Sequence, residues 1–325
     1  MPALTAVDDG PHVPPEVTAP GWRESWALDW HDRTAGVAAA YRVLAIPGGR
    51  GPQARSWTLA GGAVTTRAEA AGPGLHVDAH GVRAGGLSMR ALVPLRSYAV
   101  TAGPGTHLTY TSGTDDAIRF SMSGQRADPG EHYESFGTVA GTIRGCGDLT
   151  EIAALGHYRH SWGALDPGAR LVRSVHGTFG GGLFFTVSEY RTPAGTVAVG
   201  YLADDAEFHG VEKARLQVET DRRGRPQSLD LMIATADRRD FRILGTVIAA
   251  AFDGPGFAEF SLGRYRGTGV IELHPRRLTR GITTAAARSP TAASPARATT
   301  VPRATRCNRP EPRHATGRSG DHERS

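Results

Sequence analysis

The stretch ARLQVETDRRGRPQSLDLMIAT, residues 214–235, sets the fold class of this chain. In its first half Ala214, Leu216 and Val218 alternate with polar residues, which is the two-residue period of a strand with one buried face. DRRG then supplies turn-forming residues, and a second β-prone run, RPQSLDLMIAT, follows. We therefore predict an antiparallel hairpin that turns at Gly224.

Short runs of the same kind fill the chain from residue 21 to residue 274, separated by Gly, Pro and Asp. WRESWALDW and GVAAAYRVLAIP are the first two, and LFFTVSEY and GTGVIEL follow in the second half. No stretch shows an amphipathic helix of ordinary length. About fifteen short strands predict an all-β protein. Because that number exceeds one small sandwich, we expect two barrels or sandwiches, or one very large barrel.

Composition divides the chain into four parts. Residues 1–20 are proline-rich and acidic, which predicts a disordered lead-in. The weakest join between strands lies near residues 144–168, so we expect one barrel over 21–145 and a second over 146–274. Residues 275–325 hold mostly Ala, Thr, Pro, Ser and Arg, a composition that predicts a disordered tail because it cannot bury enough apolar surface to fold.

The net charge of +5 comes from this tail. Its eleven arginines and three acidic residues give a charge of +8, so the other 274 residues carry 5 − 8 = −3. A folded part without a basic surplus does not indicate nucleic acid as a partner. We interpret the tail as a solvated extension, with a nucleic-acid or acidic partner for it as the alternative.

Several classes of site have no signature in the sequence. Cys146 and Cys307 are too few and too far apart for a disulfide framework or a metal cluster. A GxxxxGK[ST] phosphate loop, an HExxH zinc site and paired CxxC motifs are all missing, so we expect no cofactor and no metal. Neither a signal peptide nor the roughly 18 apolar residues of a membrane span is visible, which predicts a cytoplasmic protein without a transmembrane segment. A peripheral membrane contact and the oligomeric state stay open.

The midpoint of the chain, GHYRHSWG at residues 156–163, gathers more chemically capable side chains than any other stretch. In an extended backbone they alternate between two faces, with Tyr158, His160 and Trp162 on one and His157, Arg159 and Ser161 on the other. One face then carries an imidazole between two aromatic rings. No GxSxG elbow surrounds the serine, so the motif does not favour a hydrolase. No nearby Cys or carboxylate completes a metal-ligand set.

This motif and its surroundings resemble a known family. RHSWG stands where the carotenoid 1,2-hydratases (hydroxyneurosporene synthases) and the related AttH-type proteins have Asp-His-Asn/Ser-Trp-Gly, at the centre of two lipocalin-like β-barrels. The resemblance extends to ESWALDW and GVAAAYRVLAIP, to HYESFGTVAGTI and to GRYRGTGVIEL. It is nearest to actinobacterial relatives and covers residues 20–274. It implies two antiparallel lipocalin-like barrels packed together.

The resemblance also implies functional residues. His160 and Trp162 match the motif positions implicated in hydratase chemistry, whereas Arg159 replaces the family's leading acid. The family uses a Tyr/Asp pair further along the chain, where this sequence has Glu189 and Tyr190 in reversed order. The activity implied is that of a cofactor-independent hydro-lyase that adds water to a terminal C=C bond.

The residues themselves can support such chemistry. Hydration of an isolated alkene needs a strong proton donor and shelter for a developing cation. Glu189 shares an apolar strand face with Phe185, and burial in apolar surroundings raises the pKa of a carboxylic acid. Tyr158 and Trp162 can stabilise a cation by ~1–2 kcal/mol when desolvated. His160 can orient the attacking water or relay a proton.

Other interpretations of the same residues stay open. His160 and Trp162 can instead form a structural pair between the barrels, and Glu189 can mark a strand end that reaches solvent. Our candidate catalytic residues are His160, Trp162 and Glu189, and our candidate ligand-binding residues are Tyr158, Arg159, Phe185 and Tyr190.

We predict a hydrophobic, lipid- or isoprenoid-like ligand in a β-barrel cavity. The ligand is either hydrated there, as in carotenoid hydratases, or bound without catalysis by a lipocalin-like protein. A cyclase or isomerase of secondary metabolism that uses the same cavity is the third alternative.

Overall fold

Strand β1 (Trp22–Asp32) is an inner strand of the first of two sheets, between β2 and β12. Its tryptophans, Trp22, Trp26 and Trp30, are four residues apart, a spacing that suits a helix but also places all three on one face of a strand. All three are buried. The prediction of a strand for WRESWALDW is therefore confirmed.

The computed structural model describes residues 4–12, 22–46, 53–69, 75–78, 80–113, 118–121, 131–144, 148–164, 170–180, 182–204 and 207–274. The tail predicted for 275–325 lies outside the described residues. No helix in the described part of the chain is long and apolar enough to cross a membrane.

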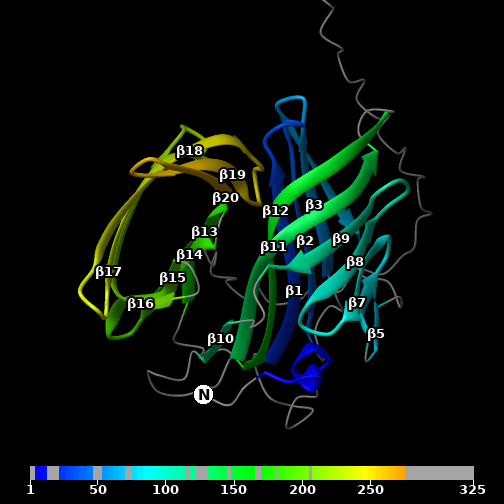
Figure 1. Ribbon diagram of the computed structural model, residues 1–325, viewed down its shortest axis with the longest axis horizontal. Helices are drawn as coiled ribbons and strands as arrows, with labels where there is room; N and C mark the ends of the chain where they lie inside the picture. The colour runs from blue at the N-terminus through cyan, green and yellow to red at the C-terminus, as the bar shows by residue number, and fades with distance from the viewer. Residues whose placement is uncertain are drawn as a thin grey trace, which may run out of the picture. The chain divides into compact units, whose positions relative to one another are not determined.

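The first sheet is antiparallel and curled, and β1 and β12 lie side by side in it (Figure 1). On one side of β1 the order is β2 (Val37–Ala45), β3 (Gln53–Ala60) and β4 (Ala63–Glu69). On the other side it is β12 (Leu149–Ala164), β11 (Glu131–Arg144), β9 (His107–Ser112), β8 (Ser97–Ala102), β7 (Leu87–Val93), β6 (Gly81–Ala84) and β5 (Leu75–Asp78). Strand β10 (Ile118–Ser121) pairs with β11.

The second sheet is a closed barrel of eight antiparallel strands in sequence order. These are β13 (Arg170–Gly180), β14 (Leu183–Thr192), β15 (Gly195–Asp204), β16 (Glu207–Thr220), β17 (Pro226–Thr235), β18 (Asp240–Ala250), β19 (Gly256–Leu262) and β20 (Tyr265–Leu273). Pairing of β13 with β20 closes it. The hairpin predicted around Gly224 is β16–β17, and Leu216 and Leu231 from its two strands lie in the barrel core.

The all-β fold class is confirmed, with one closed barrel and one curled sheet. The change from one sheet to the other falls between β12 and β13, whereas the sequence placed the join after residue 145. The physical reason is strand pairing: β12 forms a long hairpin with β11 and also pairs with β1 from Trp22 to His31. The motif GHYRHSWG therefore belongs to the first sheet.

The inner face of the first sheet carries an aromatic core. It contains Trp26, Tyr98, Tyr110, Tyr133 and Tyr158, all at most 2% exposed. Tyr98 and Tyr158 stack with their ring centroids 3.9 Å apart. Alternation along β12 thus places Tyr158 in this core, as predicted for an extended backbone.

The disordered lead-in predicted for residues 1–20 is corrected over residues 4–12 only, because residues 1–3 and 13–20 lie outside the described residues. Residues 4–12 are described, and Ala6–Asp9 forms a 3-10 helix. Asp9 is buried and accepts hydrogen bonds from the hydroxyls of Tyr98 and Tyr133 and from the backbone N–H of Leu95. One carboxylate with three donors is enough to hold a polar segment on the sheet, a contact that composition does not reveal.

The outer face of the first sheet packs against the outside of the closed barrel. One apolar cluster there joins Ala38, Ala40, Trp57 and Leu59 to Ala251, Phe257 and Val270. A second joins Phe136 to Phe184, Tyr201 and Ala203. The rings of Phe136 and Phe184 stack 4.3 Å apart. Apolar contacts therefore surround a more polar region between the sheets.

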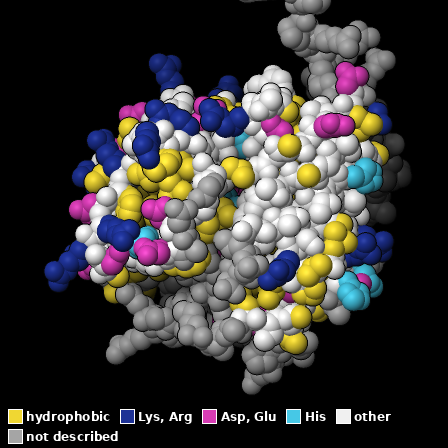
Figure 2. Space-filling view, viewed as in Figure 1, with side chains coloured by type: hydrophobic (Ala, Val, Ile, Leu, Met, Phe, Trp, Pro, Cys, Tyr) yellow, Lys and Arg dark blue, Asp and Glu magenta, His cyan; other side chains and the backbone are white. Residues whose placement is uncertain are grey.

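On the molecular surface in Figure 2, basic and acidic side chains are intermingled over the closed barrel. Several form ion pairs, such as Arg242 with Asp230 and Arg225 with Asp221. This distribution agrees with the small net charge of the chain before the tail.

Candidate functional site

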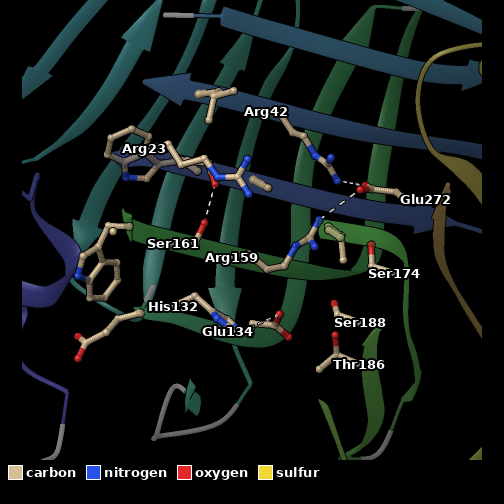
Figure 3. Close-up of a pocket in the computed structure, with 18 of the residues that line it drawn as sticks. Arg23, Arg42, His132, Glu134, Arg159, Ser161, Ser174, Thr186, Ser188 and Glu272 are labelled. Atoms are coloured by element: carbon tan, nitrogen blue, oxygen red, sulfur yellow. Dashed lines mark hydrogen bonds and ion pairs between the residues drawn. The ribbon is translucent and has the colours of Figure 1, made fainter. Parts of the chain in front are cut away.

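A cavity of about 340 Å³ lies between the two sheets. Its walls come from β1, β2, β11 and β12 of the first sheet and from β13, β14, β15 and β20 of the closed barrel (Figure 3). Because side chains alternate along each strand, the first sheet contributes mainly its outer face. On β12 this is the face of Arg159 and Ser161, opposite to that of Tyr158 and His160.

The structure separates the motif residues that the sequence grouped. Arg159 and Trp162 line the cavity, as does Tyr190 of β14. Tyr158 and His160 are on the inner face, where both are at most 1% exposed. The aromatic face of the motif is therefore mainly core, and its charged face is the cavity wall.

Two further candidates lie in the closed barrel. Phe185 points into the barrel core, where its ring contacts Phe260 edge-on at 5.3 Å. Glu189 accepts two hydrogen bonds from the guanidinium of Arg173, at 2.8 and 3.0 Å. Neither residue is among those that line the cavity.

Two arginines and one glutamate form the charged wall of the cavity. Arg42 of β2 makes an ion pair with Glu272 of β20, and Nη2 of Arg159 lies 3.7 Å from the same carboxylate (Figure 3). Burial, with repulsion from Arg159, lowers the pKa of Arg42 to about 10. The guanidinium of Arg42 therefore remains charged at neutral pH.

Donor groups in the same wall have no partner among the described residues. These are Nε of Arg159 and the hydroxyl of Ser174. Ser161 and Ser25, by contrast, hydrogen-bond to each other at 2.7 Å. Unpaired donors beside a cavity are positions at which oxygen atoms of a bound molecule can be recognised.

Below this wall lies an ionised glutamate with two histidines. Oε2 of Glu134 is 3.1 Å from Nε2 of His157 and accepts a hydrogen bond from the Tyr201 hydroxyl at 3.2 Å. Its Oε1 is 3.6 Å from Nε2 of His132. Burial opposes ionisation, but the neighbouring His157, His132 and Arg159 outweigh it and hold the pKa of Glu134 well below its usual range.

His132 and Tyr190 are two titratable groups at the cavity that are suited to proton transfer. Burial lowers the pKa of His132, against the attraction of Glu134, so its imidazole is neutral at pH 7. Burial raises the pKa of Tyr190, although Arg23 acts in the opposite direction, so its hydroxyl keeps the proton. A neutral imidazole can accept a proton and a phenol can donate one.

The rest of the cavity lining is mixed. Leu44, Leu171 and Val199 contribute apolar side chains, and Thr186 and Ser188 contribute hydroxyl groups. The site therefore combines charged, polar and apolar walls, which differs from the apolar barrel interior expected from the sequence.

Sequence reasoning missed the partners of His160. Its Nε2 lies 2.8 Å from Oε1 of Glu24, and Nδ1 of His12 lies 3.0 Å from the same oxygen. His12 stacks on Trp162 with ring centroids 3.8 Å apart. The acid beside His160 thus comes from β1, which no spacing around the motif could indicate.

The chain was compared with known proteins. Residues 5–269 match the model of a family described as a domain of unknown function, DUF7064. No curated protein matches the chain significantly.

Solved structures share the fold. An AttH-like protein, NE1406 from Nitrosomonas europaea, is 14% identical with a TM-score of 0.60, over 84% of this chain and 97% of the other. Kievitone hydratase from Nectria haematococca is 12% identical with a TM-score of 0.57, over 83% and 92%. CghA with Sch210972 is 11% identical with a TM-score of 0.53, over 81% and 92%. At these identities the likeness shows the fold alone.

Proposed function

We propose that this chain, which belongs to the DUF7064 family, binds an amphipathic organic acid between its two sheets. The ligand has an apolar body and an anionic head. The carrying observation is a cavity of about 340 Å³ whose lining combines guanidinium groups, those of Arg23, Arg42 and Arg159, with the apolar side chains of Leu44, Leu171 and Val199.

The guanidinium groups of the lining favour an anionic head group. Arg42 pairs with Glu272, and Arg159 pairs with Asp29 and Glu272, whereas Arg23 lines the cavity without an ion pair within the described residues. Nε of Arg159 and the hydroxyl of Ser174 are buried donors without a partner among these residues. A wholly hydrocarbon ligand would leave both donors desolvated, at a cost of roughly 1–3 kcal/mol for each.

Apolar side chains in the same lining favour a hydrophobic body. Burial of apolar ligand surface against Leu44, Leu171 and Val199 contributes roughly 25 cal/mol per Å². The volume is at the lower end of the range of about 300–1,000 Å³ for small-molecule sites. A medium-chain or compact cyclic acid fits this description better than a full-length carotenoid.

Decanoate and its methyl ester test the proposal, because they share the apolar chain and differ in charge. We expect the acid to quench the fluorescence of the cavity tryptophans and to bind at least about tenfold more tightly than the ester, a difference of ~1.4 kcal/mol. Arg23→Gln should reduce this preference, whereas Arg215→Gln on the exposed side of β16 should not. Equal affinities for acid and ester would contradict an anionic head group.

A second candidate function is cofactor-independent hydration of a C=C bond in the bound acid. It is favoured by the neutral imidazole of His132 and the protonated hydroxyl of Tyr190 at one cavity. The imidazole takes a proton from water as its oxygen bonds to one carbon, and the phenol gives a proton to the other. Proton return from the imidazolium to the phenolate restores both groups, so one water is consumed.

9-Decenoic acid tests the reaction because it carries a terminal C=C bond and an acidic head. Hydration adds the mass of one water, cyclisation or isomerisation leaves the mass unchanged, and a binding protein returns the substrate. Tyr190→Phe and His132→Gln should abolish the mass gain, with Arg215→Gln as the control. Binding of decanoate without turnover of 9-decenoic acid would leave binding as the function.

A further inference from the structure

Three buried side chains from three strands meet where the sheets touch. Asp29 of β1 and His157 of β12 are register partners, and His176 comes from β13 of the closed barrel. The two imidazole centroids are 4.2 Å apart. One oxygen or nitrogen atom of each residue lies within 4.8 Å of those of the other two. Each residue is at most 3% exposed.

Polar atoms of this cluster have no hydrogen-bond partner among the described residues. They are Oδ1 of Asp29, Nδ1 of His157 and both ring nitrogens of His176. A second cavity, of about 20 Å³, is lined by all three residues. A cavity of roughly 10–15 Å³ already holds one small guest. Buried polar atoms are rarely left unpaired. The cluster therefore has both the space for such a guest and unpaired oxygen and nitrogen atoms to bind it.

We propose that the guest is a divalent transition-metal ion bound by Asp29, His157 and His176. Imidazole and carboxylate are ligands of zinc, at about 2.0–2.2 Å. Nε2 of His176 and Oδ2 of Asp29 lie 3.1 Å apart without hydrogen-bond geometry. Such a close approach is typical of two ligands that share an ion, because bonds of about 2 Å place their atoms roughly 3 Å apart.

Neighbouring groups orient the ligands. A hydrogen on Nε2 of His157 is donated to Oε2 of Glu134, 3.1 Å away, and this tautomer leaves a lone pair on Nδ1. A carboxylate behind a histidine in this way is common at metal sites. Arg159 donates to Oδ2 of Asp29 at 3.3 Å and so fixes the orientation of the carboxylate beside His176.

The site is structural in character. Its cavity is too small for an organic substrate, and its ligands connect the first sheet to the closed barrel. Because metal bonds form only in the folded state, the ion would stabilise the contact between the sheets. This role is separate from ligand binding in the larger cavity, although Glu134 and Arg159 line that cavity and also contact the cluster.

A second group of ligand-type side chains, His12, Glu24 and His160, provides a built-in control. Its members already bond to one another at 3.0 and 2.8 Å. Hydrogen bonds therefore explain why these three side chains lie close together, without a bound ion.

The test uses the full chain without an affinity tag. Metal content is measured by mass spectrometry after purification, and again after chelation and return of Zn²⁺, with Mg²⁺ as the control ion. We expect one zinc per chain and a zinc-dependent rise of several degrees in melting temperature. X-ray absorption of the zinc-loaded protein should show two imidazoles and oxygen, without sulfur.

Variants assign the site. His176→Ala should lose the zinc and the thermal shift, whereas His12→Ala should keep both. If His176→Ala does not fold, the imidazole count from X-ray absorption of the unmodified chain still decides. No bound zinc and no thermal shift, sulfur ligation, or loss of zinc in His12→Ala would each overturn the proposal, the first in favour of an ordered water.

Discussion

Nη2 of Arg159 donates a hydrogen bond to Oδ2 of Asp29 at 3.3 Å, across the pairing of β12 with β1. Arg159 occupies the position at which the hydratase motif that this chain resembles has an acid. In this chain the acid that faces Arg159 is Asp29, on the neighbouring strand. The Asp29 carboxylate is 2% exposed and the Arg159 side chain 19%. The pair is therefore a largely buried ion pair between the motif on β12 and strand β1.

Removal of the arginine should destabilise the fold. Arg159→Gln removes the cation that is hydrogen-bonded to the buried Asp29 carboxylate, and loss of one partner of a buried pair costs about 3–5 kcal/mol. Arg173→Gln removes the more exposed pair with Glu189 and should cost at most ~1 kcal/mol. Urea unfolding of both variants measures the loss of unfolding free energy. Equal losses would show that the pair with Asp29 contributes no more to stability than the pair with Glu189.

The N-terminal segment should contribute to stability. Asp9→Asn weakens the acceptor shared by Tyr98, Tyr133 and Leu95, for an expected loss of about 1–3 kcal/mol. Asp253→Asn, in an exposed turn, is the matched control. Thermal unfolding compares the two variants.

Removal of residues 276–325 should leave the melting temperature nearly unchanged. A large decrease would show that the tail packs on the folded part.

Acid should destabilise the protein from pH 6.5 downwards. Burial lowers the pKa of His160 from its usual 6.5, against the attraction of Glu24, so the folded state stays neutral where the unfolded state binds a proton. This contribution is complete above pH 6.5 and is lost as the pH falls towards the lower folded pKa, by at most ~1.4 kcal/mol per pH unit. His160→Phe should flatten the slope of unfolding free energy against pH between 7 and 5. An unchanged slope would show that another group governs it.

Phe185 should matter for stability and not for binding. Its ring is in the barrel core against Phe260, so Phe185→Ala should cost about 3–5 kcal/mol. Decanoate affinity, measured below the unfolding temperature, should stay within about twofold, because the cavity lies outside the barrel. A large loss of affinity in a folded variant would place the ligand inside the barrel.

Local patterns were sufficient to predict the strands. Alternation identified the hairpin around Gly224 and the shared face of Tyr158 and His160, because both depend only on neighbours along the chain. The closure of the second sheet depends instead on pairing between β13 and β20, about a hundred residues apart in the sequence. Composition also hid the anchoring of the N-terminal segment, which rests on Asp9.

The location of the cavity could not be predicted from the same patterns. Alternation defines two faces of β12 but not which one the other sheet covers. Glu24 and His160 are 136 positions apart, and Glu272 reaches Arg159 from the last strand. Such contacts follow from tertiary packing, so the motif alone predicted only some of the residues at the candidate site.

The location of the ligand is the central claim, and photo-crosslinking tests it most directly. A decanoate analogue with a terminal diazirine would be bound, irradiated and located by peptide mass spectrometry. We predict labels on cavity residues such as Leu44, Leu171 and Val199, which are suppressed by excess decanoate. Labels confined to barrel-core residues such as Leu216 and Leu231 would contradict the account.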